Sequence, residues 1–133
     1  MQEAARGGTN RILTFKIGAK ETLPTLPTVA RVIDPPAMTA PQDVVDLGRS
    51  HYQQYCAGCH GDTAASGGVV PDLRYSQTLA HADAWKAIVL DGAMVQNGMV
   101  SFASYLKPGD VEALRAYVIK RAHDQKAAYA TAK

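Results

Sequence analysis

The feature of this sequence that most constrains its fold is the segment 56–60, Cys-Ala-Gly-Cys-His, which contains both cysteines of the chain. Cys-x-x-Cys-His is the attachment pattern of a c-type haem, in which two thiols bond to the two vinyl groups of the porphyrin. The two-residue spacing matches the separation of the vinyl groups, and the histidine that follows lies directly beneath the ring. The motif therefore predicts one covalent haem tethered by Cys56 and Cys59, with His60 as the proximal iron ligand.

Two other uses of a Cys-x-x-Cys pair remain as alternatives. A structural zinc site needs more ligands, and the remaining histidines lack the spacing of a zinc-binding pair: His51, His81 and His123. A thioredoxin-like pair opens a helix that follows a strand, whereas the residues before Cys56 have a helical pattern and no βαβ repeat follows. Both alternatives rank below haem attachment.

Length and charge fit one haem domain with some additional chain. The protein has 133 residues and a formal net charge of +2, which two haem propionates would offset. A basic cluster near the C-terminus is expected to be the solvated face of a helix: Arg115, Lys120, Arg121 and Lys126. We therefore expect no nucleic-acid partner.

No stretch approaches the eighteen or so apolar residues of a membrane span, and residues 1–8 lack the apolar core of a secretory signal. Haem attachment of this type takes place outside the cytoplasmic membrane. We therefore expect a periplasmic protein whose export signal was removed, was replaced or lies upstream on a longer chain.

The first forty residues differ in composition from the rest. Residues 12–17 alternate between apolar and polar types, which predicts a short strand whose partners are absent, so residues 1–20 are interpreted as the remnant of a propeller-type strand. Residues 21–41 hold five of the seven prolines, which favours an extended, semi-rigid linker over a packed element. Residues 42–133 are then the haem domain.

This third region has helical patterns and no strand pattern. A capping-box signal at 39–42, with proline in the first turn, predicts a helix leading into Cys56. Further helices are predicted over 79–90 and 108–123. Their apolar faces comprise Val45, Gly48, Tyr52 and Tyr55, then Trp85, Ile88 and Val89, and then Val111, Leu114 and Val118. Three to four helices around a porphyrin make an all-α domain.

From about 39 to 122 the chain resembles a class I cytochrome c. Gly48 precedes the haem motif at the family's spacing, and Leu114 with Tyr117 matches the C-terminal helix that crosses the first helix. Pro71 falls in the family's Pro-x-Leu segment, and the resemblance implies that its carbonyl accepts a hydrogen bond from Nδ1 of His60.

The sixth iron ligand is sought among the methionines of the loop between Gly92 and Pro108. Both Met94 and Met99 lie in this glycine-punctuated loop, where a thioether can reach a metal. Segment 97–102, Asn-Gly-Met-Val-Ser-Phe, resembles the family's Gly-Met-Pro-x-Phe, with valine where proline is usual. The resemblance favours Met99, and Met94 remains the alternative. A His/Met pair implies a positive potential and no open iron position.

Segments 69–76, 88–92, 97–103 and 110–118 resemble the C-terminal cytochrome domain of quinohaemoprotein alcohol dehydrogenases. This likeness implies that the haem accepts electrons from a dehydrogenase domain that carries pyrroloquinoline quinone (PQQ) and calcium. It also implies an acceptor that is a soluble redox protein or is linked to quinone. No PQQ, calcium or alcohol site is assigned to this chain, and no residue in it is expected to catalyse a reaction.

The resemblance also implies haem-contacting side chains. Arg74 is expected either to pair with a haem propionate or to be an exposed surface arginine. Phe102, Tyr75 and Trp85 are expected to help exclude water from the iron. Two other functions stay open, a freestanding diffusible periplasmic cytochrome and a haem-based sensor or weak peroxidase with a displaceable sixth ligand.

Overall fold

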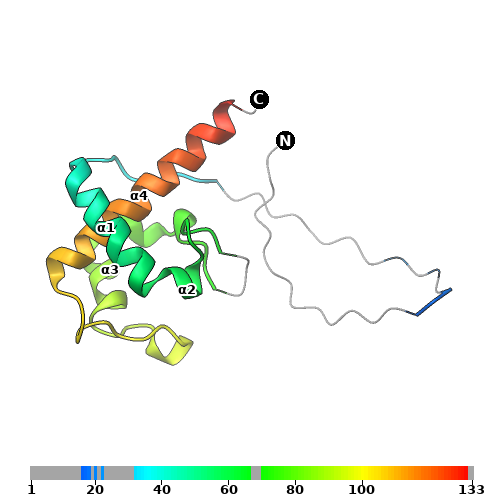
Figure 1. The fold of residues 1–133 in the computed structure, drawn as a ribbon, viewed down its shortest axis with the longest axis horizontal. Coiled ribbons are helices and arrows are strands. Elements are labelled where there is room, and N and C mark those ends of the chain that lie inside the picture. Colours follow the sequence, from blue (N-terminus) through cyan, green and yellow to red (C-terminus); the bar gives the residue numbers. More distant parts are fainter. Residues whose placement is uncertain (1–15, 19, 21, 23–31, 67–69, 132–133) are drawn as a thin grey trace.

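The computed structural model describes residues 16–18, 20, 22, 32–66 and 70–131. The described chain contains four α-helices, α1 (Gln42–Tyr55), α2 (Ala57–His60), α3 (Ala82–Val89) and α4 (Pro108–Thr131), together with three 3-10 helices and no strand. The 3-10 helices are η1 (Leu73–Tyr75), η2 (Gln77–Ala80) and η3 (Val95–Asn97). Figure 1 shows α1 and α4 crossing, with α3 and the loops on one side of the crossing. The all-α prediction is confirmed.

The crossing of α1 and α4 depends on a glycine. A Cβ atom placed on Gly48 would lie 1.9 Å from the carbonyl oxygen of Ala113, so only a residue without a side chain permits this approach. One turn further along α1, Tyr52 packs against Tyr117 of α4, with their ring centroids 5.1 Å apart. The pairing of Gly48 with the C-terminal helix, predicted from the resemblance, is therefore seen in the packing.

Helix α3 is joined to this pair through Trp85. Its indole Nε1 donates a hydrogen bond to the carbonyl oxygen of Val111 at 3.2 Å, and the side chain is 6% exposed. A buried indole N–H needs such a partner, because leaving it unpaired costs free energy. The largest fully buried side chains are Tyr52, Leu79, Val111, Leu114 and Val118.

The first helix does not begin as the capping box predicts. Pro41 is the N-cap residue, with extended backbone angles (φ −69°, ψ 161°), and no side chain caps the helix. Thr39 thus lies two residues outside the position from which a hydroxyl could bond the first turn. The carbonyl oxygen of Pro41 accepts a hydrogen bond of 3.2 Å from the amide of Val45. Asp43 places a negative charge in the first turn, where it interacts favourably with the positive end of the helix dipole.

The other two predicted helices differ at their ends. Leu79 lies in η2 and α3 begins only at Ala82, whereas α4 continues past His123 to Thr131. The extension contains neither proline nor glycine, and Asp124 forms ion pairs with Lys120 and Arg121 one turn earlier. Such pairs support a helix that would otherwise end sooner.

Residues 32–40 form no helix or strand, but they pack against α4. The predicted linker did not include this packing. Ile33 is 6% exposed, Nε2 of His123 donates to the carbonyl oxygen of Pro36 at 2.8 Å, and Lys126 pairs with Asp34 at 2.8 Å. The segment therefore lies along the extension of α4, which gives its apolar side chain a surface to cover.

Most of the predicted strand over 12–17 lies outside the described residues. Ile17 is described and lies in an exposed turn. The boundaries proposed for the strand remnant, the linker and the haem domain stay predictions. No described helix has the length and apolar character needed to span a membrane.

Candidate haem-binding site

The Cys-x-x-Cys-His motif lies where α1 ends and α2 begins. Cys56 is both the C-cap residue of α1 and the N-cap residue of α2. Its carbonyl oxygen accepts a hydrogen bond of 2.9 Å from the amide of His60. This single helical turn brings the side chains of 56, 59 and 60 to one end of α1. Both thiols are free, Cys56 half-buried and Cys59 exposed.

His60 is held in one orientation by a backbone carbonyl. Its side chain is buried, with 8% of the residue exposed, and Nδ1 lies 3.0 Å from the carbonyl oxygen of Pro71. A carbonyl can only accept, so Nδ1 carries a proton and donates it, and in the neutral imidazole Nε2 then holds the lone pair. No described residue bonds to Nε2. The imidazole is therefore in the tautomer that can ligate iron through Nε2.

The turn after His60 depends on two residues that sequence reasoning did not assign to the site. Gly61 has φ +78°, and a Cβ there would lie 2.4 Å from the carbonyl oxygen of Ala65. The carbonyl of Gly61 accepts a hydrogen bond of 2.7 Å from the hydroxyl of Tyr52, and burial raises the pKa of that phenol. A glycine directly after the motif was the available signal for this turn.

The Cys56 thiol does not resemble the attacking thiol of a redox disulfide. Burial raises the pKa of Cys56 to about 12, so the thiol is neutral at pH 7, whereas the attacking cysteine of a thioredoxin-like pair has a lowered pKa. Among the described residues, no group of three or more His, Cys, Asp or Glu side chains could hold a metal ion.

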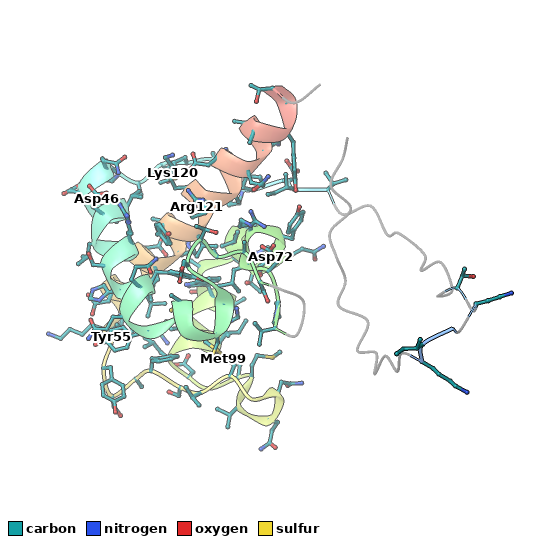
Figure 2. The ribbon with its side chains drawn as sticks, turned by 45° about the vertical axis from the view of Figure 1, so that its right-hand side comes forward. Asp46, Tyr55, Asp72, Met99, Lys120 and Arg121 are labelled. Carbon is teal, nitrogen blue, oxygen red and sulfur yellow. The ribbon has the colours of Figure 1, made fainter. Side chains whose placement is uncertain are left out.

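The loop that carries Met99 is tied to the end of α3. The amide of Phe102 donates to the carbonyl of Val89 at 2.8 Å, and the hydroxyl of Ser101 donates to the carbonyl of Leu90 at 2.5 Å. These two bonds restrain the loop directly after Val100. Both views show the loop passing below α2, and Figure 2 labels Met99 there.

The two candidate methionines differ in exposure. Met94 is 40% exposed, whereas Met99 is half-buried, and the amide of Met99 donates to the carbonyl of Met94 at 3.2 Å. Met99 is thus the less exposed of the two residues. The choice of Met99 over Met94 as iron ligand stays a prediction.

The aromatic residues expected to exclude water occupy different places. Phe102 is half-buried and meets Tyr55 edge-on, with ring centroids 5.9 Å apart. Tyr75 is half-buried, and its hydroxyl lies 3.2 Å from that of Tyr129. Trp85 lies between α3 and α4, where it contributes to the core. Phe102 is thus the aromatic that shares the methionine loop.

The guanidinium of Arg74 is engaged by another partner than the predicted propionate. Nε and Nη2 donate to the two carboxylate oxygens of Asp72 at 3.0 and 2.7 Å, and Nη1 donates to Oε1 of Gln125 at 2.6 Å. The neighbouring carboxylate raises the pKa of Arg74. A guanidinium has five N–H donors and these bonds use three of them, so the propionate contact stays a prediction.

Together these residues fit a covalent haem. Two thiols and an imidazole lie on one helical turn, the imidazole has its Nε2 lone pair available, and a half-buried thioether lies in a loop on the side below α2. This is the set of groups that thioether attachment and His/Met ligation require.

Comparison with known proteins agrees with this geometry. The family described as "Cytochrome C oxidase, cbb3-type, subunit III" matches residues 43–118. The "Alcohol dehydrogenase (quinone), dehydrogenase subunit" of Acetobacter aceti is 39% identical over 85% of this chain and 15% of its own length. "Cytochrome c550" of Pseudomonas aeruginosa is 42% identical over 56% of this chain and 53% of its own length.

A solved structure shows the same fold. The quinohemoprotein alcohol dehydrogenase ADHIIG from Pseudomonas putida HK5 superposes with a TM-score of 0.65 and 35% identity over 85% of this chain and 15% of that chain. This chain thus spans about 15% of the length of the dehydrogenases that it matches. It belongs to the family of cytochrome c domains described as cbb3-type subunit III, it has the class I cytochrome c fold, and it matches the cytochrome domain of quinohaemoprotein alcohol dehydrogenases.

Proposed function

We propose that this chain transfers electrons through a single haem attached to Cys56 and Cys59 and ligated by His60 and Met99. Family membership implies electron transfer in general terms. One observation carries the specific assignment. His60, the residue directly after the cysteine pair, is buried, and its Nδ1–H donates a hydrogen bond to the Pro71 carbonyl.

The bound haem supplies one-electron exchange between ferric and ferrous iron. The chain's own part is to hold and cover it. Pro71 keeps the imidazole in one tautomer, and the bonds of Ser101 and Phe102 hold the methionine loop in place. A haem held by His60 and Met99 in such a rigid site would change little on reduction, which would favour fast electron transfer.

We further propose a PQQ-dependent alcohol dehydrogenase domain as the electron donor and a soluble redox protein or quinone-linked carrier as the acceptor. The support is the set of dehydrogenase relatives that this chain matches over most of its own length. Alcohol oxidation, PQQ and calcium would belong to the remainder of such a polypeptide. The corresponding compartment is the periplasm, where c-type haem is attached.

A second candidate is a freestanding diffusible periplasmic cytochrome c. It is favoured by the cytochrome c550 relative, which is shorter than the dehydrogenases, since this chain covers 53% of it. In this alternative the haem and its ligands are the same, and only the donor differs.

A haem stain of a denaturing gel tests attachment. The chain, expressed with the haem-attachment machinery and exported, should give a stained band near 14.2 kDa. The Cys56→Ser/Cys59→Ser double variant is the matched control and should lose the stain, because no thioether can form. An unstained wild-type band would overturn the proposal.

The same stain distinguishes the two candidates when it is applied to the exported proteins of the source organism and probed with an antibody against this chain. A band several times larger, positive in both tests, supports a dehydrogenase parent. A band of this chain's own size supports the diffusible cytochrome instead.

A further inference from the structure

The hydrogen bond between His60 and Pro71 persists only if the Pro71 carbonyl is held in position. That carbonyl begins a short segment, 71–75, which runs through η1 and contacts α4. The backbone amide of Leu73 donates to the carbonyl of Ala64 at 3.2 Å, which ties one side of the segment to the turn after the haem motif. The other side is held by side chains.

The first of these contacts is an ion pair that lies mostly out of water. Two N–H groups of Arg74 donate hydrogen bonds to the two carboxylate oxygens of Asp72, and the two side chains are only 13% and 14% exposed. The backbone amide of Arg74 also donates to Oδ1 of Asp72 at 3.1 Å. This fork makes the residues next to Pro71 into one stiff unit.

Two residues of α4 attach that unit to the helical frame. Oε1 of Gln125 accepts from Nη1 of Arg74 at 2.6 Å, and the hydroxyl of Tyr129 lies 3.2 Å from that of Tyr75. Gln125 and Tyr129 are four residues apart, so they lie on the same face of the helix. Both belong to the part of α4 beyond His123. Figure 2 shows Asp72 below the C-terminal half of α4.

We propose that Gln125 and Tyr129 are positioning residues, which hold segment 71–75 and thereby keep the Pro71 carbonyl on Nδ1 of His60. The inference rests on the proposed role of His60 as the iron ligand and deepens it. The C-terminal extension of α4 then has a function beyond its own stability, because it controls the basicity of the proximal histidine. A histidine whose Nδ1–H is firmly bonded is the more basic ligand and favours ferric iron.

The test is the rate at which the His60 Nδ1–H proton exchanges with solvent, measured by NMR on the haem-loaded protein. In the Gln125→Ala/Tyr129→Phe double variant the bond opens more often, and exchange should be about tenfold faster, the factor that corresponds to losing one ordinary hydrogen bond. The midpoint potential should rise in the same variant, because the imidazole becomes a weaker donor. Gln125→Glu keeps an acceptor for Arg74 and should exchange at the wild-type rate.

Lys126→Ala is the matched control, since Lys126 lies in the same turn of α4 but pairs with Asp34 of segment 32–40. It should leave both readouts unchanged. Unaltered exchange and potential in the double variant would overturn the proposal, as would equal acceleration in Lys126→Ala. If the double variant does not fold, Gln125→Ala and Tyr129→Phe each remove one contact and allow the same comparison. Haem stain on the same samples reports attachment separately, so this inference can fail while the proposed function stands.

Discussion

The two segments that carry the predicted iron ligands are held by different kinds of contact. Around His60, the chain is fixed by two part-buried hydrogen bonds, to the Pro71 carbonyl and from the Tyr52 hydroxyl, and by a mostly buried ion pair. The loop with Met99 has no charged residue from 92 to 106 and is tied by the bonds of residues 101 and 102 to the end of α3. Its exposed apolar side chains are Met94, Val95, Val100 and Tyr105.

This difference indicates that polar contacts within the protein fix the conformation around His60, whereas fewer such contacts fix the loop around Met99. A buried polar contact specifies one geometry, because every alternative leaves a polar group unpaired. Exposed apolar side chains specify much less. We therefore expect variants on the histidine side to affect folding, and variants on the methionine side to affect mainly the iron.

The largest expected effect is at the helix crossing on which both segments depend. Gly48→Ala puts a Cβ within 1.9 Å of the Ala113 carbonyl, so the helices must separate, at a cost of about 3 kcal/mol or more in unfolding free energy. Urea unfolding measures it. Gly109→Ala, in the first turn of α4 with nothing within 4 Å, is the control and should be neutral or stabilising by up to about 1 kcal/mol. Equal stability of the two variants would contradict the crossing.

Asp72→Ala tests the histidine side directly. Removing the carboxylate leaves Arg74 with an unpaired charge in a mostly buried place, and we expect a loss of about 2–3 kcal/mol. Asp91→Ala near the methionine loop is the matched control, because its pair with Lys86 is about half exposed and should contribute about 0–1 kcal/mol. Thermal or urea unfolding of both variants measures the two losses of stability. Similar losses for Asp72→Ala and Asp91→Ala would contradict the expected difference between the two segments.

Met99→Ala tests the methionine side. Loss of a thioether ligand should lower the midpoint potential by on the order of 0.1 V, because axial ligands set haem potentials over a range of about 0.8 V. The opened iron should also bind imidazole, seen as a shift in the absorption spectrum. Met94→Ala should do neither. If Met94→Ala lowers the potential and Met99→Ala does not, the ligand is Met94.

Ser101→Ala removes the bond between the methionine loop and the Leu90 carbonyl. The expected loss is about 1 kcal/mol of stability, the contribution of one ordinary hydrogen bond, together with weaker retention of Met99 on the iron. Competition with added imidazole measures the second effect. Ser104→Ala, at an exposed position of the same loop, should bind imidazole no better than the wild type.

The smallest effect concerns alkaline pH. Burial and the contact with Tyr129 raise the pKa of Tyr75 from 10.0 to about 12, so the folded protein favours the neutral phenol. Its stabilisation is complete below pH 10 and is lost as pH rises toward 12. The stability advantage of the wild type over Tyr75→Phe should therefore shrink as the pH rises from 10 to 12 in urea titrations. An advantage that grows over this range would contradict the assignment.

Local patterns predicted much of the fold. The positions of α1 and α3 and the start of α4 follow from apolar periodicity, and the haem motif follows from five adjacent residues. The capping box at 39–42 was wrong, because the pattern does not say whether Pro41 is helical or extended. The end of α4 was missed because no stop signal marks it.

Sequence reasoning did not find the contacts that join distant parts of the chain. The packing of 32–40 on α4 and the bond from Arg74 to Gln125 both join residues far apart in sequence. Composition indicated an extended linker, and the resemblance implied that Arg74 either pairs with a propionate or lies exposed on the surface. Neither could show that a surface of α4 lies beside these residues.

The sequence by itself predicted the haem attachment site, since the two thiols and the imidazole of the motif lie within five adjacent residues and need no distant partner. It also determined the close crossing of the helices, since Gly48 alone removes the atom that would prevent it. The resemblance already named the Pro71 carbonyl as the partner of His60, whereas only the tertiary structure showed that Arg74 and Gln125 hold the segment that carries it. Hydrogen bonds act over about 3 Å, and the chain must fold before Pro71, Arg74 and Gln125 lie within that reach.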